Sequence, residues 1–532
     1  MSGGFQRNPR FVPAVGKGLP TRLLKSAVAL SAGQLLNILG NLLLVPLFLS
    51  RWSIDQYGEW MALSAVVAYF GVSDLGMNSA ASNVMTAAYA RGDIERYRFL
   101  QGSAMAFYLS MASIVSVLLV GTIAVFPVPV WIGIRHIPLA TAKCVVWLLA
   151  ARVLWQMPAA QLFTIYRSTG NLAATQWFGN LQAVGMVIAA AVPLVLDGGV
   201  FAVAAWSLAP LLLVTLSAWR SLGGSHPELL PRLSAARIRG IRELMGPSLM
   251  FGLIMISVAV ATQGPVLLVS AALGGASVAL LVTTRTLTNV IRQITGLLGT
   301  ALWPELTRLD ATGSAESLRF GLRLLAFSLA TFCAALAGTL WFEGAEVISV
   351  WTGRRLVPDI WLLRLLLIAL VLQTPWLASS AFTVASNRHR ALSYSYAVSA
   401  VLSVITTAIL VRPCGLIAVP IGVILGDAAA CYHFVIKDTC HMLNLGYLRT
   451  AARLWVGVGA VSLLAWAAAW LGHCLAFGPA PLRWLQVGAL TTLAAALTAW
   501  GLALRQEDRA RIVRWGRSRW PTQNPLVPES AA

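Results

Sequence analysis

The sequence predicts an all-α protein that crosses a membrane many times, with about fourteen transmembrane helices. We expect two six-helix lobes related by a parallel repeat, followed by a C-terminal helix pair. Three observations predict this fold. The chain is 58% hydrophobic and only 11% charged, whereas soluble domains are about a quarter charged. Its apolar runs are long and nearly free of charge, which excludes a barrel of short alternating strands. Two internal sequence matches indicate a repeat.

Apolar runs of about twenty residues, the length that crosses a bilayer as a helix, divide the chain into spans. The first run follows a basic tail rich in Pro and Gly that lacks the features of a cleavable signal, so we expect it to be retained as the first helix. The predicted spans are 27–50, 60–85, 102–126, 140–165, 172–196, 200–219, 245–272, 277–303, 321–342, 360–385, 392–411, 414–436, 452–473 and 482–504.

Positive charge sets the expected orientation. The net charge is +20, and 27 of the 39 Lys and Arg residues fall on one side of the membrane when the N-terminus is cytoplasmic. Because Lys and Arg accumulate in cytoplasmic loops, both termini are predicted to lie in the cytoplasm. An even number of spans also keeps the arginine-rich C-terminal tail on that side. This placement of charge indicates membrane topology rather than nucleic-acid binding.

The internal repeat is the signal for two lobes. Residues 90–99 and 311–320 agree at five of ten positions with a constant offset of 221, and 154–158 resembles 371–375. Both pairs fall on corresponding helices, as expected of a parallel repeat. The predicted organisation is an N-terminal lobe at 1–219, a basic cytoplasmic linker at 220–244, a C-terminal lobe at 245–436, and helices 13–14 with a basic cytoplasmic tail at 437–532.

Several classes of function are disfavoured. The sequence has no Gly-rich phosphate loop, no HExxH and no GxSxG motif, and its six cysteines show no metal-ligand spacing. The predicted external connections run to fewer than about twenty residues, which leaves no room for an extramembrane catalytic domain. We therefore expect no enzyme, no catalytic residue, no metal and no cofactor.

A polar stripe in the predicted span 277–303 is the strongest candidate site. Arg285, Asn289, Arg292 and Gln293 share one helical face. An arginine at the centre of a bilayer costs about 2.5–3.5 kcal/mol, so the stripe is predicted to face a protein interior. We interpret the two arginines as an anion-binding pair. The alternative is a structural pairing with Asp74 or with a helix end.

Other polar residues are predicted to converge on the same cavity. Arg152, in the middle of the span 140–165, is a candidate second phosphate contact, although a snorkelling or carbonyl-bound arginine is an equal alternative. Polar faces also occur in three other spans of the two lobes. They comprise Gln34, Asn37 and Asn41 in the first span, Asp74 and Asn78 in the second, and Gln263 beside Gly264 and Pro265 in the seventh.

Asp74 is interpreted as the one acidic residue well inside a predicted span. It can pair with an arginine or carry a coupling proton, and the ion pair is favoured. Arg323 and Arg364 lie near span ends, where we expect their side chains to extend toward the membrane surface. The Gln-Pro pairs at 156–158 and 373–375 predict kinked or broken helices.

Several motifs resemble those of bacterial oligosaccharide repeat-unit flippases, which belong to the multidrug, oligosaccharidyl-lipid and polysaccharide exporter superfamily. The resemblance lies in 45–60, which contains Tyr57-Gly58-Glu-Trp60, in 70–78, in Ala90-Arg-Gly92-Asp93, and in Trp303-Pro304-Glu305-Leu306. It implies two six-helix lobes around a cationic cavity, faced by Arg285 and Arg292, that moves undecaprenyl-diphosphate-linked sugars across the bacterial inner membrane for O-antigen or exopolysaccharide synthesis.

The resemblance also implies partners, namely the lipid-linked oligosaccharide, membrane lipids and the polysaccharide polymerase and chain-length machinery, with the transporter itself a monomer. Three alternatives stay open. They are a cation-coupled multidrug exporter of the same fold, a lipid II flippase, and a non-transporting scaffold or polymerase subunit. The sequence does not settle whether protons, sodium or the membrane potential supplies the energy.

Overall fold

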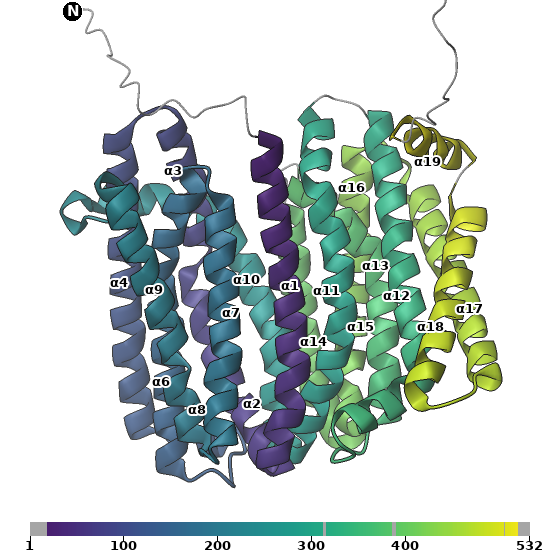
Figure 1. Ribbon diagram of the computed structural model, residues 1–532, viewed down its shortest axis with the longest axis horizontal. Helices are drawn as coiled ribbons and strands as arrows, with labels where there is room; N and C mark the ends of the chain where they lie inside the picture. The colour runs from purple at the N-terminus through teal and green to yellow at the C-terminus, as the bar shows by residue number, and fades with distance from the viewer. Residues whose placement is uncertain (1–18, 312–314, 386–389, 505, 520–532) are drawn as a thin grey trace, which may run out of the picture. The chain divides into compact units, whose positions relative to one another are not determined.

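The structure is helical throughout the residues that the computed structural model describes, which are 19–311, 315–385, 390–504 and 506–519 (Figure 1). Within these residues, eleven helical segments are long and apolar enough to cross a membrane. The predicted fold class, an all-α multi-pass membrane protein, is therefore confirmed. The prediction that fails in detail is the second span, 60–85.

The second predicted span is broken at its middle. It consists of α2 (Ile54–Ala68), the 3₁₀ turn η2 (Tyr69–Asp74) and α3 (Met77–Ala90). Leu75 and Gly76 have φ values of 48° and 73°, which end one helix before the next begins. A Cβ on Gly76 would lie 2.7 Å from the Ser248 carbonyl oxygen, so the break is pressed against α10 (Ile238–Leu273) and only glycine fits there.

Two predicted spans form one hairpin. α14 (Arg390–Cys414) turns at Gly415, which has φ 66°, and α15 (Ala418–Ala429) returns against it. The helices approach so closely that Cβ atoms on Gly422 and Gly426 would lie 2.5 and 2.4 Å from carbonyl oxygens of α14. The apolar segment 390–429 therefore folds back on itself, so a 40-residue stretch supplies two of the fourteen predicted helices.

The Gln-Pro pairs predicted to kink or break helices do not break them, and the kinks stay a prediction. α6 (Leu139–Ser168) continues through Pro158, and α13 (Ile360–Ala385) continues through Pro375. α11 (Gly275–Ala311) covers the polar span 277–303 as one helix. The remaining long helices are α1 (Leu19–Arg51), α4 (Ile94–Val125), α7 (Leu172–Val195), α9 (Leu208–Ser225) preceded by α8 (Val200–Trp206), α12 (Ala315–Trp351), α17 (Tyr447–Leu475), α18 (Ala480–Thr498) and α19 (Gln506–Arg519).

Corresponding helices begin at regular intervals along the chain. α2 and α11 begin at Ile54 and Gly275, 221 positions apart, and α4 and α12 begin at Ile94 and Ala315 with the same separation. α6 and α13 repeat it once more. A parallel repeat of helices would produce this spacing. The division into two lobes itself stays a prediction.

The chain forms two compact units. The first contains residues up to Leu297 together with 344–372 and 388–435, and it holds the three cavities discussed below. Its core includes an aromatic group at the junction of α1 and α2, where Phe48 lies 5.0 Å from Trp52 and 5.5 Å from Tyr57, ring centre to ring centre. This junction fixes the end of α1 relative to α2.

Helix α1 is held along its length within the first unit. It packs on α7, where Gly33 and Gly40 allow close approach and the Asn180 amide donates to the Ala29 carbonyl at 2.9 Å. At its other end the Trp351 indole N–H donates to the Leu42 carbonyl at 2.7 Å. These contacts direct the polar face of α1 toward neighbouring helices. Exposed leucines at 35, 39 and 43 occupy the opposite face, as the 100° step of a helix requires.

The second unit contains 298–343, 373–387 and the chain from Ile436 onward. Here the Arg323 guanidinium forms a bidentate pair with Asp508 of α19, at 2.8 and 2.6 Å, and the Asp508 side chain is only 2% exposed. Sequence analysis did not anticipate this partner, and the expected position of Arg323 at the membrane surface stays a prediction.

Within the first unit Arg364 lies over the ring of Trp361, with its guanidinium carbon 5.6 Å from the ring centre. Of the predicted basic cytoplasmic tail, Arg505 and residues 520–532 lie outside the described residues.

Candidate functional site

Three cavities adjoin one another along the polar face of α1. We name them the amide cavity, the Arg152 cavity and the Arg285 cavity, after the groups that line them. Asn37 lines both the amide cavity and the Arg152 cavity, and Asn41 lines both the Arg152 cavity and the Arg285 cavity. The polar stripe predicted on the first span therefore runs along all three.

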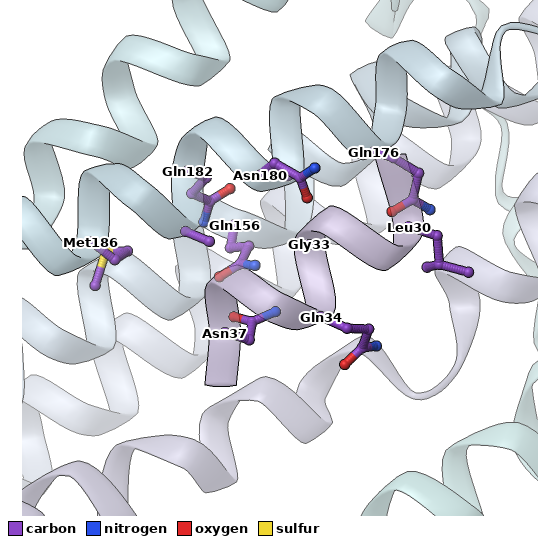
Figure 2. Close-up of a pocket in the computed structure, with 11 residues that line it drawn as sticks. Leu30, Gly33, Gln34, Asn37, Gln156, Gln176, Asn180, Gln182 and Met186 are labelled. Carbon is purple, nitrogen blue, oxygen red and sulfur yellow. The ribbon is translucent and has the colours of Figure 1, made fainter. Parts of the chain in front are cut away.

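The amide cavity has a volume of about 340 Å³ and lies between α1, α6 and α7 (Figure 2). Figure 2 shows Gln156 and Gln182 across from Asn37. Of its carboxamides, Asn180 is bonded to the α1 backbone, whereas the others make no hydrogen bond within the part of the chain that the structure describes. The six carboxamides belong to Gln34, Asn37, Gln156, Gln176, Asn180 and Gln182.

The Arg152 cavity, about 360 Å³, contains a guanidinium with few partners. Nη1 of Arg152 lies 3.7 Å from the Met186 sulfur, which is a weak acceptor, and Nε is buried without a hydrogen bond. Among the described residues no carboxylate or carbonyl group neutralises this charge. The neutral wall facing it includes Asn41, Ser64 and Ser207.

The Arg285 cavity, about 300 Å³, contains most of the polar stripe predicted on α11. Nη1 of Arg285 donates to the Thr262 carbonyl of α10 at 2.8 Å. Pro265, three residues further along α10, has no N–H to give to the preceding turn. One of the five N–H donors of Arg285 is thus occupied, and no acid pairs with it within the described chain. Asn289 and Gln293 of α11, Gln263 of α10 and Asn41 of α1 complete the polar lining.

The charge of the three cavities has one sign. None of the residues that line them is acidic, and two are arginines. An uncompensated guanidinium or a carboxamide without a hydrogen bond is costly away from water, so these groups require water or a polar ligand. The arrangement suits a ligand that combines negative charge with many hydroxyl groups.

Not every predicted residue joins these cavities. Arg292 lies on α11 with its side chain exposed and does not line any of the three. Asp74 and Asn78 form a separate polar group. The Tyr108 hydroxyl donates to Asp74 at 2.5 Å, Asp74 accepts the Asn78 N–H at 3.3 Å, and Thr164 donates to the Asn78 amide oxygen at 3.3 Å.

The favoured ion pair between Asp74 and an arginine was wrong for the described residues. Asp74 instead caps the N-terminus of α3 at the break after η2, where an acidic side chain accepts otherwise unbonded N–H groups. The physical reason is local. The break at Leu75 leaves the first N–H groups of α3 beside the Asp74 carboxylate. The Asn78 N–H is therefore a local partner, which the folding of this segment alone supplies.

Sequence reasoning missed three features. Asp427 also lies inside a predicted span, at 5% exposure on α15, and accepts a hydrogen bond from Ser399 at 2.7 Å. The amides of α7 were not recognised as a group, although Gln176 and Asn180 are spaced one helical turn apart. Gln156 was interpreted as a feature of helix architecture, yet it lines the amide cavity.

No protein-family model and no curated protein matches the chain. Among solved structures, the lipid II flippase MurJ in an inward closed conformation matches with a TM-score of 0.69, 12% sequence identity and coverage of 90% of this chain and 99% of that one.

Two further structures match over most of their length. One is a multidrug resistance MATE family transporter of the MOP superfamily in its inward-facing conformation, with a TM-score of 0.59, 16% identity and coverage of 81% and 98%. The other is a MOP superfamily transporter from Pyrococcus furiosus Vc1, with a TM-score of 0.54, 14% identity and coverage of 80% and 96%. The chain therefore has the fold of the MOP superfamily transporters.

Proposed function

We propose that the protein is a flippase that moves undecaprenyl-diphosphate-linked oligosaccharide repeat units across the bacterial inner membrane by alternating access. The observation that carries the proposal is the series of three adjoining cavities along α1, lined by Arg152, Arg285 and unbonded carboxamides. The MOP fold supports it, because solved structures of that fold include transporters and a lipid II flippase.

The two arginines match a diphosphate in charge and geometry. A guanidinium presents parallel N–H donors that bind phosphate oxygens bidentately. Arg152 and Arg285 lie on α6 and α11 and line adjoining cavities that share Asn41 and Ser64. A bound diphosphate would supply the negative charge that neither arginine receives from the described residues. Arg292 contributes in this proposal to the positive field rather than as a direct ligand.

The apolar part of such a substrate has a plausible path. The face of α1 opposite its amides carries three leucines that are more than half exposed, at positions 35, 39 and 43. An isoprenoid chain that stays in lipid keeps its hydrocarbon away from water. We propose that the tail remains on this side while the head group occupies the cavities.

A cation-coupled drug exporter is disfavoured by the same lining. An organic cation needs carboxylates, and none lines the three cavities. Asp74 is engaged with Tyr108 and the start of α3, and Asp427 with Ser399. A lipid II flippase remains the second candidate, because MurJ shares the fold over 90% of this chain and lipid II also carries a diphosphate.

Deletion of the gene tests the proposal and separates the two candidates. We expect lipid-linked repeat units to accumulate in the inner leaflet, surface polysaccharide to disappear, and the amount of lipid II in that leaflet to remain normal. The measurements are leaflet-resolved mass spectrometry of lipid extracts and gel analysis of surface polysaccharide. Accumulation of lipid II with loss of viability would instead favour the second candidate. Unchanged levels of both lipids would refute a flippase.

A further inference from the structure

We propose that the amide cavity is a subsite for uncharged sugar residues of the substrate, those nearest the diphosphate. This inference rests on the proposed function and assigns the substrate's parts to different cavities. The amide cavity shares Asn37 and Met186 with the Arg152 cavity. A sugar bound there would thus lie next to a phosphate bound at Arg152.

The lining chemistry fits sugar hydroxyls. A carboxamide offers one acceptor oxygen and two N–H donors, and a hydroxyl group can serve as donor and acceptor at once. Gln34, Asn37, Gln156, Gln176 and Gln182 have these groups unused within the described residues. No charged side chain lines this cavity, so nothing there would balance the carboxylate of an acidic sugar.

One wall of the cavity is held in place before any ligand arrives. Asn180 is only 6% exposed, and its amide N–H is fixed by the Ala29 carbonyl. A Cβ on Gly33 would lie 2.4 Å from the Asn180 amide oxygen, so α1 and α7 are in direct contact there. Such preorganisation reduces the entropy lost on binding and favours a defined ligand orientation.

The size of the cavity limits its occupant. A volume of about 340 Å³ lies at the small end of the range of about 300–1,000 Å³ found for small-molecule sites. This suits one sugar ring or two rather than a whole repeat unit. The remaining sugars would extend into water, which leaves the transporter tolerant of their identity.

The experiment compares two probes on purified protein in detergent. One is the lipid-linked repeat unit extracted from the deletion strain, and the other is undecaprenyl diphosphate, which has no sugar. Wild-type protein should bind the lipid-linked repeat unit at least about tenfold more tightly than undecaprenyl diphosphate, and this ratio of affinities is the quantity measured. Gln34→Leu combined with Gln156→Leu should reduce this ratio to about one while leaving the affinity for undecaprenyl diphosphate unchanged. Gln176→Leu, on α7, is the second variant and should reduce the ratio in part.

The controls separate this inference from the proposed function. Gln56→Leu removes an amide of α2 that lines none of the three cavities, and it should leave both affinities unchanged. Arg285→Met should weaken both probes alike. Failure of wild-type protein to bind undecaprenyl diphosphate would contradict the proposed function. Two results would overturn the sugar subsite alone. One is an unchanged ratio of the two affinities in both glutamine variants, and the other is an equal loss of affinity for both probes in these variants.

Discussion

Replacement of Arg285 by methionine should weaken binding of the diphosphate and yet not destabilise the protein. Methionine keeps most of the length and volume of the side chain and removes the charge. In the structure the guanidinium uses one N–H on the Thr262 carbonyl and leaves its other donors for a ligand in the Arg285 cavity. The two effects of the substitution can be estimated separately.

The binding effect is large. A hydrogen bond to a charged group contributes about 1.5–3 kcal/mol, so loss of one bidentate contact should cost about 3 kcal/mol. That corresponds to roughly a hundredfold weaker affinity for undecaprenyl diphosphate. Arg285→Lys keeps the charge and loses the planar fork of donors. Its affinity for undecaprenyl diphosphate should therefore lie between those of the wild type and Arg285→Met.

The stability effect has the opposite sign. Removing an arginine from the middle of a membrane relieves about 2.5–3.5 kcal/mol, and the lost bond to Thr262 offsets about 1 kcal/mol of that gain. Arg285→Met should therefore melt at or above the temperature of the wild type. Isothermal calorimetry with undecaprenyl diphosphate and thermal melting in detergent measure the two quantities. Unchanged affinity would refute the anion site. A loss of affinity accompanied by unfolding would refute the argument that the buried Arg285 destabilises the folded protein.

Three further predictions concern the rest of the molecule. Asp74→Ala should lower stability by about 1 kcal/mol because it removes the cap of α3, whereas Asp74→Asn, which can still cap, should change it little; chemical denaturation measures both. Arg323→Met should destabilise the second unit by about 3–5 kcal/mol because it removes the bidentate partner of the buried Asp508 carboxylate, and Asp508→Leu added to it should restore the melting temperature. Gly58→Ala should prevent folding because its Cβ would lie 1.8 Å from a carbonyl oxygen of α11, while Gly121→Ala, with open space around it, should be neutral or stabilising in a detergent stability assay.

Much of the fold follows from hydropathy, because a membrane leaves helices as almost the only way to satisfy the backbone. Each of the fourteen apolar runs corresponds to a helical part of the described chain. The break in 60–85 was not foreseen because Gly76 can also sit inside a transmembrane helix. Its cause is the tight packing on α10, which involves residues more than 170 positions away.

The site was predictable where a stripe lay on a single helix. Arg285, Asn289 and Gln293 line one cavity, as the helical period on α11 requires, and Asn41 and Gln263 join them there. Contacts between helices could not be predicted in this way. The hydrogen bond from Tyr108 to Asp74 depends on how η2 packs beside α4, and the pairing of Arg323 with Asp508 joins residues 185 positions apart.

In the flippase that we propose, the contact between α2 and α11 has a consequence for the transport cycle. Gly58 and Gly275 place two backbones in direct contact, and the Asp55 carboxylate accepts the Ala276 N–H at 2.9 Å across the same joint. By the predicted topology, both helices begin at the outer surface of the membrane, so we propose that this contact is part of the closed outward side. A substrate bound along α1 would then leave outward only after the two helices separate, and glycine's lack of a side chain leaves little buried hydrocarbon to hold them together. A disulfide engineered across this contact would trap the loaded transporter with its cargo still inside.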